Sequence, residues 1–249
     1  MIYLHIGTHK TGTTAIQLTL KDSVQTLQAK GFYYDSVWND IGYLLSARSP
    51  LKDEDITRLR SQADEYTQDV IISSEGFMGD PNTAYANIEA VASDAKKIFG
   101  DMKVIAYYRP QVDFIESWYA HLVKDGGCLS FADWLKDYPW KKLIWSDLFA
   151  HYDNVTAVPY YADSLTFMDL PITIGANPSV NRRGLDLALK VNPYLEWEEK
   201  RGFRKYLEEN YRRQIGEKLN FISDDLRKSM MDWYAIDELF SKYHLRARQ

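Results

Sequence analysis

The sequence predicts an α/β fold in which a central parallel sheet is flanked by helices and followed by a helical C-terminal part. Three observations support this prediction. Short apolar runs typical of buried strands alternate with longer segments whose apolar residues recur at helical spacing. A glycine-containing turn joins the first strand to the first helix. From about Arg183 onward the pattern is helical throughout.

The first half of the chain supplies the elements in alternating order. A strand is expected over residues 2–6, followed by a helix over 13–27 that ends before Gly31. A buried strand over 70–73 comes next, and a helix over 83–99 follows it and ends at a glycine. The alternation of strand and helix favours parallel pairing with helical crossovers.

The second half completes the sheet and then becomes helical. A strand over residues 103–108 leads into a helix over 110–123, and a later strand is expected over 154–160. Two charged segments with apolar residues at helical spacing predict helices over 197–219 and 224–245. No repeat, low-complexity tract or Pro/Gly-rich linker divides the chain, so we expect a single domain over residues 1–249.

Composition and charge narrow the class of protein. The chain is 45% hydrophobic and 26% charged, as soluble globular proteins are. Its net charge of −5 argues against a general nucleic-acid binder. No run approaches the ~20 apolar residues of a membrane span. Cys128 is the one cysteine, which excludes an internal disulfide and a cysteine-rich zinc site, so a cytoplasmic location is expected.

The segment from Gly7 to Thr14 predicts an anion site. It lies between the first strand and the first helix, where free backbone N–H groups and the helix dipole favour negative charge. Gly7 and Gly12 permit the bends and the close approach that such a loop needs. The hydroxyls of Thr11, Thr13 and Thr14 add further donors.

A comparison with the phosphate loop of ATP-using enzymes changes the expected ligand. Gly7, Gly12 and Thr14 fit the pattern G-x-x-x-x-G-K-[ST], but Thr13 occupies the lysine position and Lys10 lies inside the loop. A triphosphatase also needs a strand ending in Asp to help hold Mg²⁺. The candidate strands here end in Ser-Ser-Glu and Tyr-Tyr-Arg instead.

The string HIGTHKTGTT resembles the 5′-phosphosulfate loop of sulfotransferases that use 3′-phosphoadenosine 5′-phosphosulfate (PAPS), especially the bacterial branch. That family carries a Lys-[Ser/Thr]-Gly-[Ser/Thr]-[Ser/Thr] core, matched here from Lys10 to Thr14. The resemblance implies a three-layer α/β/α fold like that of P-loop NTPases and PAPS as cosubstrate, without a metal. It implies cosubstrate contacts from His9, Lys10, Thr11, Gly12, Thr13 and Thr14. An ordinary turn, with Gly and Thr as turn and cap, is the alternative.

A second motif resembles the family's site for the 3′-phosphate of PAPS, which consists of an Arg at a strand end and a Ser about two helical turns later. Here Arg109 ends the strand, Pro110 suits a first helical turn, and Ser117 follows in the segment YYRPQVDFIESWYAHLVK. The guanidinium of arginine suits phosphate. Taken singly, Arg109 reads as a surface ion-pair residue and Ser117 as an exposed helix residue.

Sulfonyl transfer needs a cation beside the departing phosphate and a base for the acceptor hydroxyl. Lys10 is the candidate cation, and Glu75 is the candidate base because it follows a buried strand at the ligand-binding edge of the sheet. Some carbohydrate-acting relatives have a Glu at the matching place. Glu75 could instead cap the next turn or pair with Lys10. His5 and His9 are rival bases.

Several other polar and aromatic residues have weaker signals. His121 and His151 lack supporting context, and Ser73 and Ser74 are expected to satisfy backbone groups. The string Arg182-Arg183-Gly184 is similar to a 3′-phosphate cap in some relatives, although a charged helix start explains it better. Five aromatic residues could stack on a ligand, but most of them are expected to belong to the core: Trp118, Tyr119, Trp134, Trp140 and Trp145.

The sequence therefore predicts a PAPS-dependent sulfotransferase that acts on an acceptor hydroxyl, which the bacterial relatives suggest is on a saccharide. Residues 1–165 would form the nucleotide-binding core and residues 166–249 a mostly helical extension on the acceptor side. Two other functions stay open: a P-loop phosphotransferase or nucleotide hydrolase, and a catalytically silent nucleotide-binding scaffold.

Overall fold

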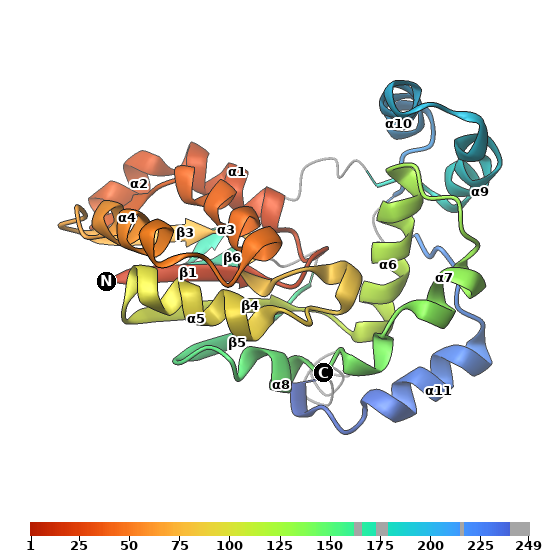
Figure 1. The fold of residues 1–249 in the computed structure, drawn as a ribbon. Coiled ribbons are helices and arrows are strands. Elements are labelled where there is room, and N and C mark those ends of the chain that lie inside the picture. The colour runs from red at the N-terminus through yellow and green to blue at the C-terminus, as the bar shows by residue number, and fades with distance from the viewer. Residues whose placement is uncertain (162–165, 173–178, 215–216, 240–249) are drawn as a thin grey trace.

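In the computed structural model, which describes residues 1–161, 166–172, 179–214 and 217–239, five parallel strands form the central sheet in the order β2–β3–β1–β4–β5 (Figure 1). The order places β1 at the centre, where Ile2 pairs with Val70 of β3 on one side and with Met102 of β4 on the other. The strands are β1 Ile2–Gly7, β2 Phe32–Tyr34, β3 Asp69–Ser73, β4 Met102–Tyr108 and β5 Val155–Pro159.

Both faces of the sheet are covered, because alternate residues of β1 enter two different apolar clusters. Leu4 and Ile6 belong to the larger cluster, with residues of α3, α4 and α5. Tyr3 packs against the smaller cluster, with residues of α1, α2 and the short β6–β7 hairpin. A strand in a parallel sheet is expected to bury both of its faces in this way.

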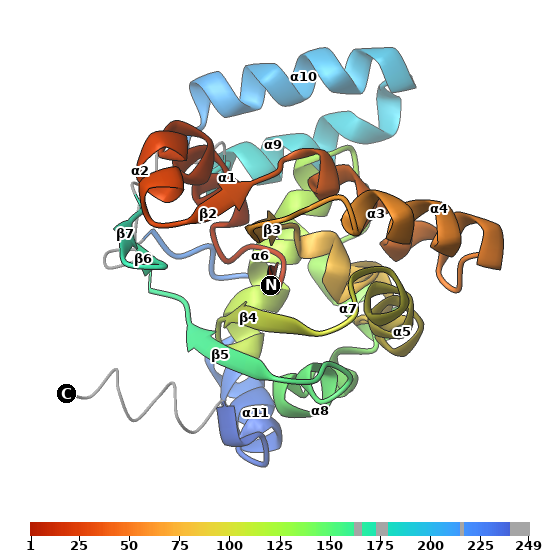
Figure 2. The same cartoon turned by 90° about the vertical axis from the view of Figure 1, so that its left-hand side faces the viewer.

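The helices form the outer two layers. Figure 2 shows α1, α2 and β6–β7 on one side of the sheet and α3, α4 and α5 on the other. This confirms the predicted α/β class with a central parallel sheet flanked by helices. The flanking elements are α1 Thr13–Asp22, α2 Val24–Ala29, α3 Val37–Arg48, α4 Asp53–Ala63, α5 Ile88–Phe99, α8 Trp145–Phe149, β6 Thr166–Phe167 and β7 Leu170–Pro171.

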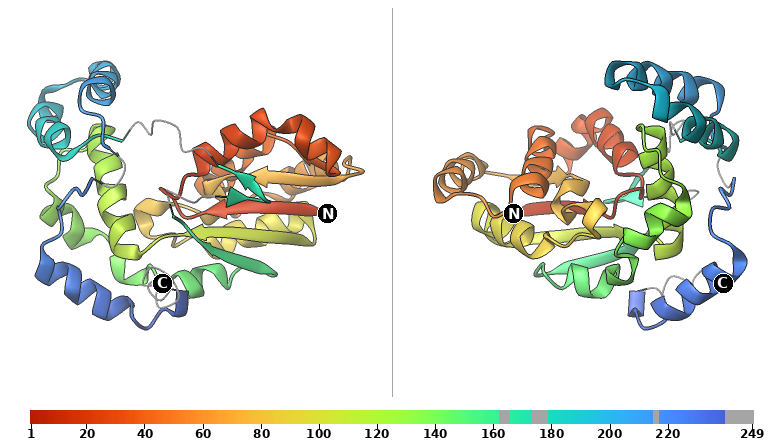
Figure 3. Two further views of the ribbon diagram at one scale, coloured as in Figure 1. Left: turned by 180° about the vertical axis from the view of Figure 1, so that it is seen from behind. Right: turned by 45° about the vertical axis from the view of Figure 1, so that its right-hand side comes forward.

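A second group of helices stands beyond the carboxyl ends of the strands (Figures 1 and 3). It combines α6, which directly follows β4, with helices from the end of the chain. The carboxyl edge of the sheet therefore faces a wall drawn from two distant parts of the sequence. The members are α6 Gln111–Lys124, α7 Phe131–Asp137, α9 Arg182–Val191, α10 Trp197–Asn210 and α11 Asp224–Tyr234.

Buried Asp237 ties the end of the described chain to the start of α6. Its carboxylate accepts hydrogen bonds from the side-chain amide of Gln111 at 2.7 Å and from the backbone N–H of Trp145 at 2.6 Å. The indole N–H of Trp145 in turn donates to the main-chain oxygen of Arg109 at 2.7 Å. Three segments thereby fix the point where β4 passes into α6.

The structure corrects the bounds of two predicted N-terminal helices. The helix expected over 13–27 is broken at Ser23, whose backbone (φ −103°, ψ 16°) leaves the helical region between α1 and α2. The helix expected over 83–99 begins only at Ile88, because Ala84 and Tyr85 have left-handed backbones at φ 52° and 62°. Tyr85 directs its buried side chain toward the loop after β1 instead.

The C-terminal part is not helical throughout. The helix expected over 197–219 ends at Asn210, since the next residues pair with an earlier segment: Asn181 donates to the oxygen of Tyr211, and Val180 bridges Arg212. The helix expected over 224–245 ends at Tyr234, and residues 240–245 lie outside the described part. Residues 32–63 form β2, α3 and α4, which were not predicted.

Candidate functional site

The loop between β1 and α1 curls over the end of its own strand. Thr8 donates its N–H to the oxygen of Tyr107 on β4 at 2.8 Å, and the Thr11 hydroxyl donates to the oxygen of Thr8 at 2.5 Å. Lys10 and Gly12 have left-handed backbones, at φ 70° and 78°. This conformation is sterically unfavourable for lysine, so the loop is a strained turn that the surrounding structure stabilises.

Gly7 is required by close packing within this loop. A Cβ at Gly7 would lie 2.7 Å from the Thr11 hydroxyl and 2.8 Å from the Thr13 hydroxyl, both too short for a real contact. The two threonine hydroxyls therefore gather above the end of β1. Thr14, the next residue of α1, is exposed.

The loop presents hydrogen-bond donors that have no acceptor among the described residues. The first-turn N–H groups of α1 have no acceptor within the helix, and Gly12 gives the helix no side-chain cap. Buried polar groups without partners are rare in folded proteins, so this concentration fits an anionic ligand. In the described part of the chain, partners are lacking for the N–H groups of Lys10, Thr11 and Gly12 and for the buried hydroxyls of Thr8 and Thr13.

Arg109, at the end of β4, is fixed against the loop. Its guanidinium donates to the main-chain oxygen of Lys10 at 3.0 Å and lies 5.9 Å from the ring centre of Tyr160. Its Nε is buried and has no partner among the described residues. The structure thus brings Lys10 and Arg109 together and leaves part of the guanidinium available for a ligand.

Positive charge is concentrated around Lys10. Burial, together with the charges of Lys124 and Arg109, lowers the pKa of Lys10 to about 8. Asp125 and Glu75 act in the opposite direction without restoring the usual value. An anion that binds beside Lys10 stabilises the charged form of this lysine.

Glu75 opens the 3₁₀ turn η1 (Glu75–Met78) directly after β3. The cap of this turn is Ser74, whose hydroxyl accepts from the Gly76 N–H at 3.2 Å, so Glu75 is not the cap. Glu75 accepts a hydrogen bond from the Tyr43 phenol, and its Oε2 is buried without a partner. It forms no ion pair with Lys10 within 4.0 Å in the described structure, although the two charges interact.

Ser73 and Ser74 have structural roles, as expected. The Ser74 hydroxyl donates to the oxygen of Asn39 at 3.0 Å, and the Ser73 hydroxyl lies 2.7 Å from Nδ1 of His5. His5 is fully buried in the sheet, and burial lowers the pKa of this histidine to about 3. Its ring lies 5.3 Å from that of Tyr107, and its Nε2 is buried without a hydrogen-bond partner among the described residues.

His9 is held on the side of the loop that faces α6. Its backbone N–H donates to the Tyr85 hydroxyl at 3.1 Å, and its ring lies edge-on to Trp118 of α6 at 5.4 Å. Burial and the charge of Lys10 lower the pKa of His9 to about 3. His9 is therefore neutral at physiological pH and links the loop to α6.

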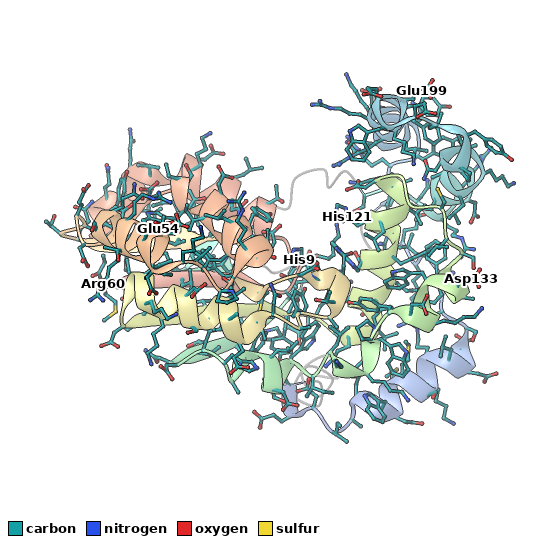
Figure 4. All side chains as sticks on the ribbon, in the orientation of Figure 1. His9, Glu54, Arg60, His121, Asp133 and Glu199 are labelled. Atoms are coloured by element: carbon teal, nitrogen blue, oxygen red, sulfur yellow. The ribbon has the colours of Figure 1, made fainter. Side chains whose placement is uncertain are left out.

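One face of α6 supplies Ser117, which the sequence analysis predicted, and His121, which it passed over. Ser117 is buried on this helix, and His121 follows one turn later. His121 had no supporting context in the sequence, yet the charge of Lys10 is the main charge that depresses its pKa, and His121 lies on the side of α6 toward the sheet (Figure 4). The i, i+4 spacing of Ser117, His121 and Asp125 was the available signal. His151 is exposed after α8.

Helix α10 supports the end of α6 through two ion pairs. Buried Lys124 lies 3.0 Å from Glu208, and Arg204 lies 3.1 Å from Asp125. Ser117 makes no hydrogen bond to Arg109 within the residues that the structure describes. The wall opposite the loop is therefore built from α6 and fixed by the C-terminal part.

The residues of the Arg182-Arg183-Gly184 string start α9. Arg182 pairs with Asp186 at 2.9 Å and lies 4.0 Å from the ring centre of Phe221, while Arg183 is exposed. This agrees with a charged helix start. Farther along the chain, burial and the charge of Arg109 lower the pKa of Arg213.

The aromatic residues near the site belong mainly to the core. Trp118, Tyr119 and Trp145 are buried, and Trp134 and Trp140 are partly buried against the same cluster. Among the described residues, no group of three or more His, Cys, Asp or Glu side chains could hold a metal ion. None of the described helices has the length and apolar composition needed to cross a bilayer.

Comparisons with known proteins give a distant structural likeness. No protein-family model and no curated protein matches the chain. The crystal structure of a sulfotransferase from Alicyclobacillus acidocaldarius superposes with a TM-score of 0.48 and 14% identity, over 97% of this chain and 95% of that one. At this level of similarity the assignment of the fold rests on the strand order and helix positions described above.

Proposed function

We propose that the protein is a PAPS-dependent sulfotransferase that transfers a sulfonyl group to an acceptor hydroxyl. The observation that carries the proposal is the position of Lys10, inside the loop and in a left-handed backbone held by Arg109. A triphosphatase would place its lysine at the start of the helix, where this chain has Thr13. The neighbouring strand β3 is followed by Ser74 and Glu75, not by a metal-binding Asp.

PAPS would bind through groups that have no hydrogen-bond partner among the described residues. The free loop N–H groups, with the hydroxyls of Thr8 and Thr13, suit the 5′-phosphosulfate end of PAPS. His9, Thr11, Gly12 and Thr14 complete that loop. Arg109 and Ser117 are proposed for the 3′-phosphate, a role that the unpaired Nε of Arg109 supports.

In the proposed reaction the acceptor oxygen attacks sulfur as the bond between sulfur and the bridging phosphate oxygen breaks. The electron pair of that bond stays on the phosphate, so the products are a sulfate ester and adenosine 3′,5′-bisphosphate. Protonated Lys10 stabilises the charge that develops on the leaving oxygen, a role that requires no metal ion. Lys10 is half-buried, where such an interaction is stronger than in water.

Glu75 is the proposed base that takes the proton of the acceptor hydroxyl. Its Oε2 is buried without a partner, and the Tyr43 hydrogen bond orients the carboxylate. The interaction between the charges of Glu75 and Lys10 supports assigning both groups to one site. His9, the remaining rival in the loop, has its pKa lowered to about 3 and is a weak base.

The first experiment compares ligands by calorimetry. We expect adenosine 3′,5′-bisphosphate to bind without metal and ATP with Mg²⁺ to bind weakly. Tight Mg²⁺-dependent ATP binding without bisphosphate binding would instead indicate a P-loop phosphotransferase or hydrolase. Incubation with ³⁵S-labelled PAPS and a panel of glycans and small alcohols then identifies the acceptor, for which a saccharide is proposed. Bisphosphate binding with no transfer to any acceptor would favour a nucleotide-binding scaffold.

A further inference from the structure

We propose that His121 is an acceptor-binding residue whose Nδ1 accepts a hydrogen bond from a hydroxyl of the acceptor beside Lys10. This inference rests on the proposed function and concerns the acceptor side of the same site. It starts from a buried polar atom: Nδ1 of His121 has no hydrogen-bond partner among the described residues. Leaving such an atom unpaired costs free energy, so a ligand group that pairs with it is favoured.

The His121 ring is held in one orientation by its neighbours. Its Nε2 lies 3.4 Å from the carboxylate of Asp125, and the ring lies 5.1 Å from that of Trp118. Arg204 of α10 holds the other oxygen of the Asp125 carboxylate at 3.1 Å. The contacts of Asp125 with Arg204 and with His121 thus fix Nε2 as the ring nitrogen that faces the carboxylate.

This arrangement determines what Nδ1 can bind. A carboxylate beside Nε2 favours the tautomer with its hydrogen on Nε2, which leaves a lone pair on Nδ1. The charged and titratable groups around the ring are Lys10 and His9 of the loop, Lys124 and Asp125 of α6, and Arg204 of α10. Burial and the nearby positive charges lower the pKa of His121 to about 3, so the ring stays neutral at physiological pH.

A neutral ring in this tautomer cannot pair with the anionic groups of PAPS. The phosphates and sulfonate of PAPS offer oxygens that accept hydrogen bonds, whereas Nδ1 needs a partner with a hydrogen to give. Glu75 Oε2 is likewise an unpaired acceptor, and both groups interact with Lys10. Two acceptors around one lysine fit a polyol: one hydroxyl gives its proton to Glu75 and a second donates to His121.

The test separates binding of the acceptor from binding of the donor. Transfer of ³⁵S from PAPS is measured to a methyl glycoside and to cyclohexanol, a ring alcohol with a single hydroxyl. We expect His121→Ala to raise the KM for the glycoside about tenfold, with kcat nearly unchanged and no effect on cyclohexanol. His121→Asn, whose amide oxygen can accept the same hydrogen bond, should restore most of the loss. The control is His151→Ala, at an exposed position.

Three results would overturn the inference: an unchanged KM for the glycoside in His121→Ala, an equal loss with both alcohols, or transfer to cyclohexanol alone. The tautomer is measured separately by ¹⁵N NMR of the histidine rings, with and without adenosine 3′,5′-bisphosphate. We expect a bare Nδ1 on His121, and a proton on Nδ1 would refute the proposal even if no alcohol accepts the sulfonyl group. Absence of bisphosphate binding to the wild type would instead count against the proposed function.

Discussion

Arg109 donates a hydrogen bond from its guanidinium to the main-chain oxygen of Lys10 at 3.0 Å. The contact joins the end of β4 to the tip of the loop after β1, so the two proposed phosphate anchors are not independent. It also leaves the ammonium group of Lys10 free, because the bond uses only the backbone of that residue. Binding and chemistry can therefore be separated by mutation.

Lys10→Ala should remove sulfonyl transfer but weaken adenosine 3′,5′-bisphosphate binding only a few-fold, because the lysine acts mainly on the charge that develops during transfer. Arg109→Ala should weaken bisphosphate binding at least tenfold, about 1.4 kcal/mol, since it removes a charged contact and loosens the loop. Calorimetry and ³⁵S transfer measure the two effects. Exposed Arg183→Ala is the control, and wild-type activity in both site variants would refute the assignment.

Bisphosphate binding should take up a proton at alkaline pH. The pKa of Lys10 is lowered to about 8, so at pH 9 much of the free protein carries a neutral amine. An anion beside it favours the charged form, which raises the pKa, so affinity falls as the pH rises above about 8. Calorimetry at pH 9 in two buffers of different ionisation enthalpy gives the number of protons. Lys10→Met should abolish this uptake; uptake retained in that variant would assign it elsewhere.

Glu75→Gln should lower kcat by roughly 10²–10⁴ with bisphosphate affinity unchanged, because the amide keeps the shape of the side chain but cannot take the proton. Tyr43→Phe removes the hydrogen bond to Glu75 and leaves the carboxylate in place, so we expect a smaller loss of kcat. Steady-state kinetics on the identified acceptor measures both. A Glu75→Gln enzyme as active as the wild type would exclude this residue as the base.

Gly7→Ala should damage the loop, because the added methyl group would meet the Thr11 and Thr13 hydroxyls at under 3 Å. We expect a loss of roughly 1–3 kcal/mol in the free energy of unfolding and much weaker bisphosphate binding. Gly202→Ala is the matched control: it is exposed in α10 with no atom within 4 Å of the new methyl, and should stabilise the protein by roughly 0.5–1 kcal/mol. Urea unfolding measures both variants.

His5 should make the protein sensitive to acid. Its folded-state pKa, lowered to about 3, is below the unfolded value of 6.5, so the unfolded chain binds the extra proton between these limits. Stability is therefore full above pH 6.5 and falls as the pH drops toward 3. Urea unfolding at pH 5 and 6 should show a pH slope that His5→Gln reduces by up to about 1.4 kcal/mol per pH unit. An unchanged slope would contradict the assigned pKa.

The sheet was largely predictable because β1, β3, β4 and β5 are mainly apolar runs, of which β1 and β3 are buried on both faces. Strand β2 was not predicted, since Phe32–Tyr34 is a three-residue edge strand that is too short to show a periodic pattern. Helix α4 carries three acidic residues in its first turn and buried Ile56, Leu59 and Ala63 at helical spacing, a signal that was present but not used. The end of α10 depends on pairing between Tyr211 and Asn181, which propensity cannot show.

Part of the candidate site was likewise readable from the chain. Lys10 and Arg109 each belong to a local motif, and the structure places them in contact. His121 lies in the segment that follows Arg109, but its significance depends on Lys10, which approaches from a loop far away in the sequence. The pairing of Asp125 with Arg204 was equally hard to predict, since it requires α6 and α10 to be packed together.

The hydrogen bonds of Asp237 have a consequence for the order in which the molecule assembles. The strand and loop that contain Lys10 are synthesised first, and Arg109 follows well before Asp237. The junction beside Arg109 is fixed through Gln111 and Trp145 only once a residue 126 positions after Gln111 has folded back. A nascent chain can therefore form the β1 loop early, but the Asp237 hydrogen bonds to Gln111 and Trp145 form only after every strand of the sheet has been made.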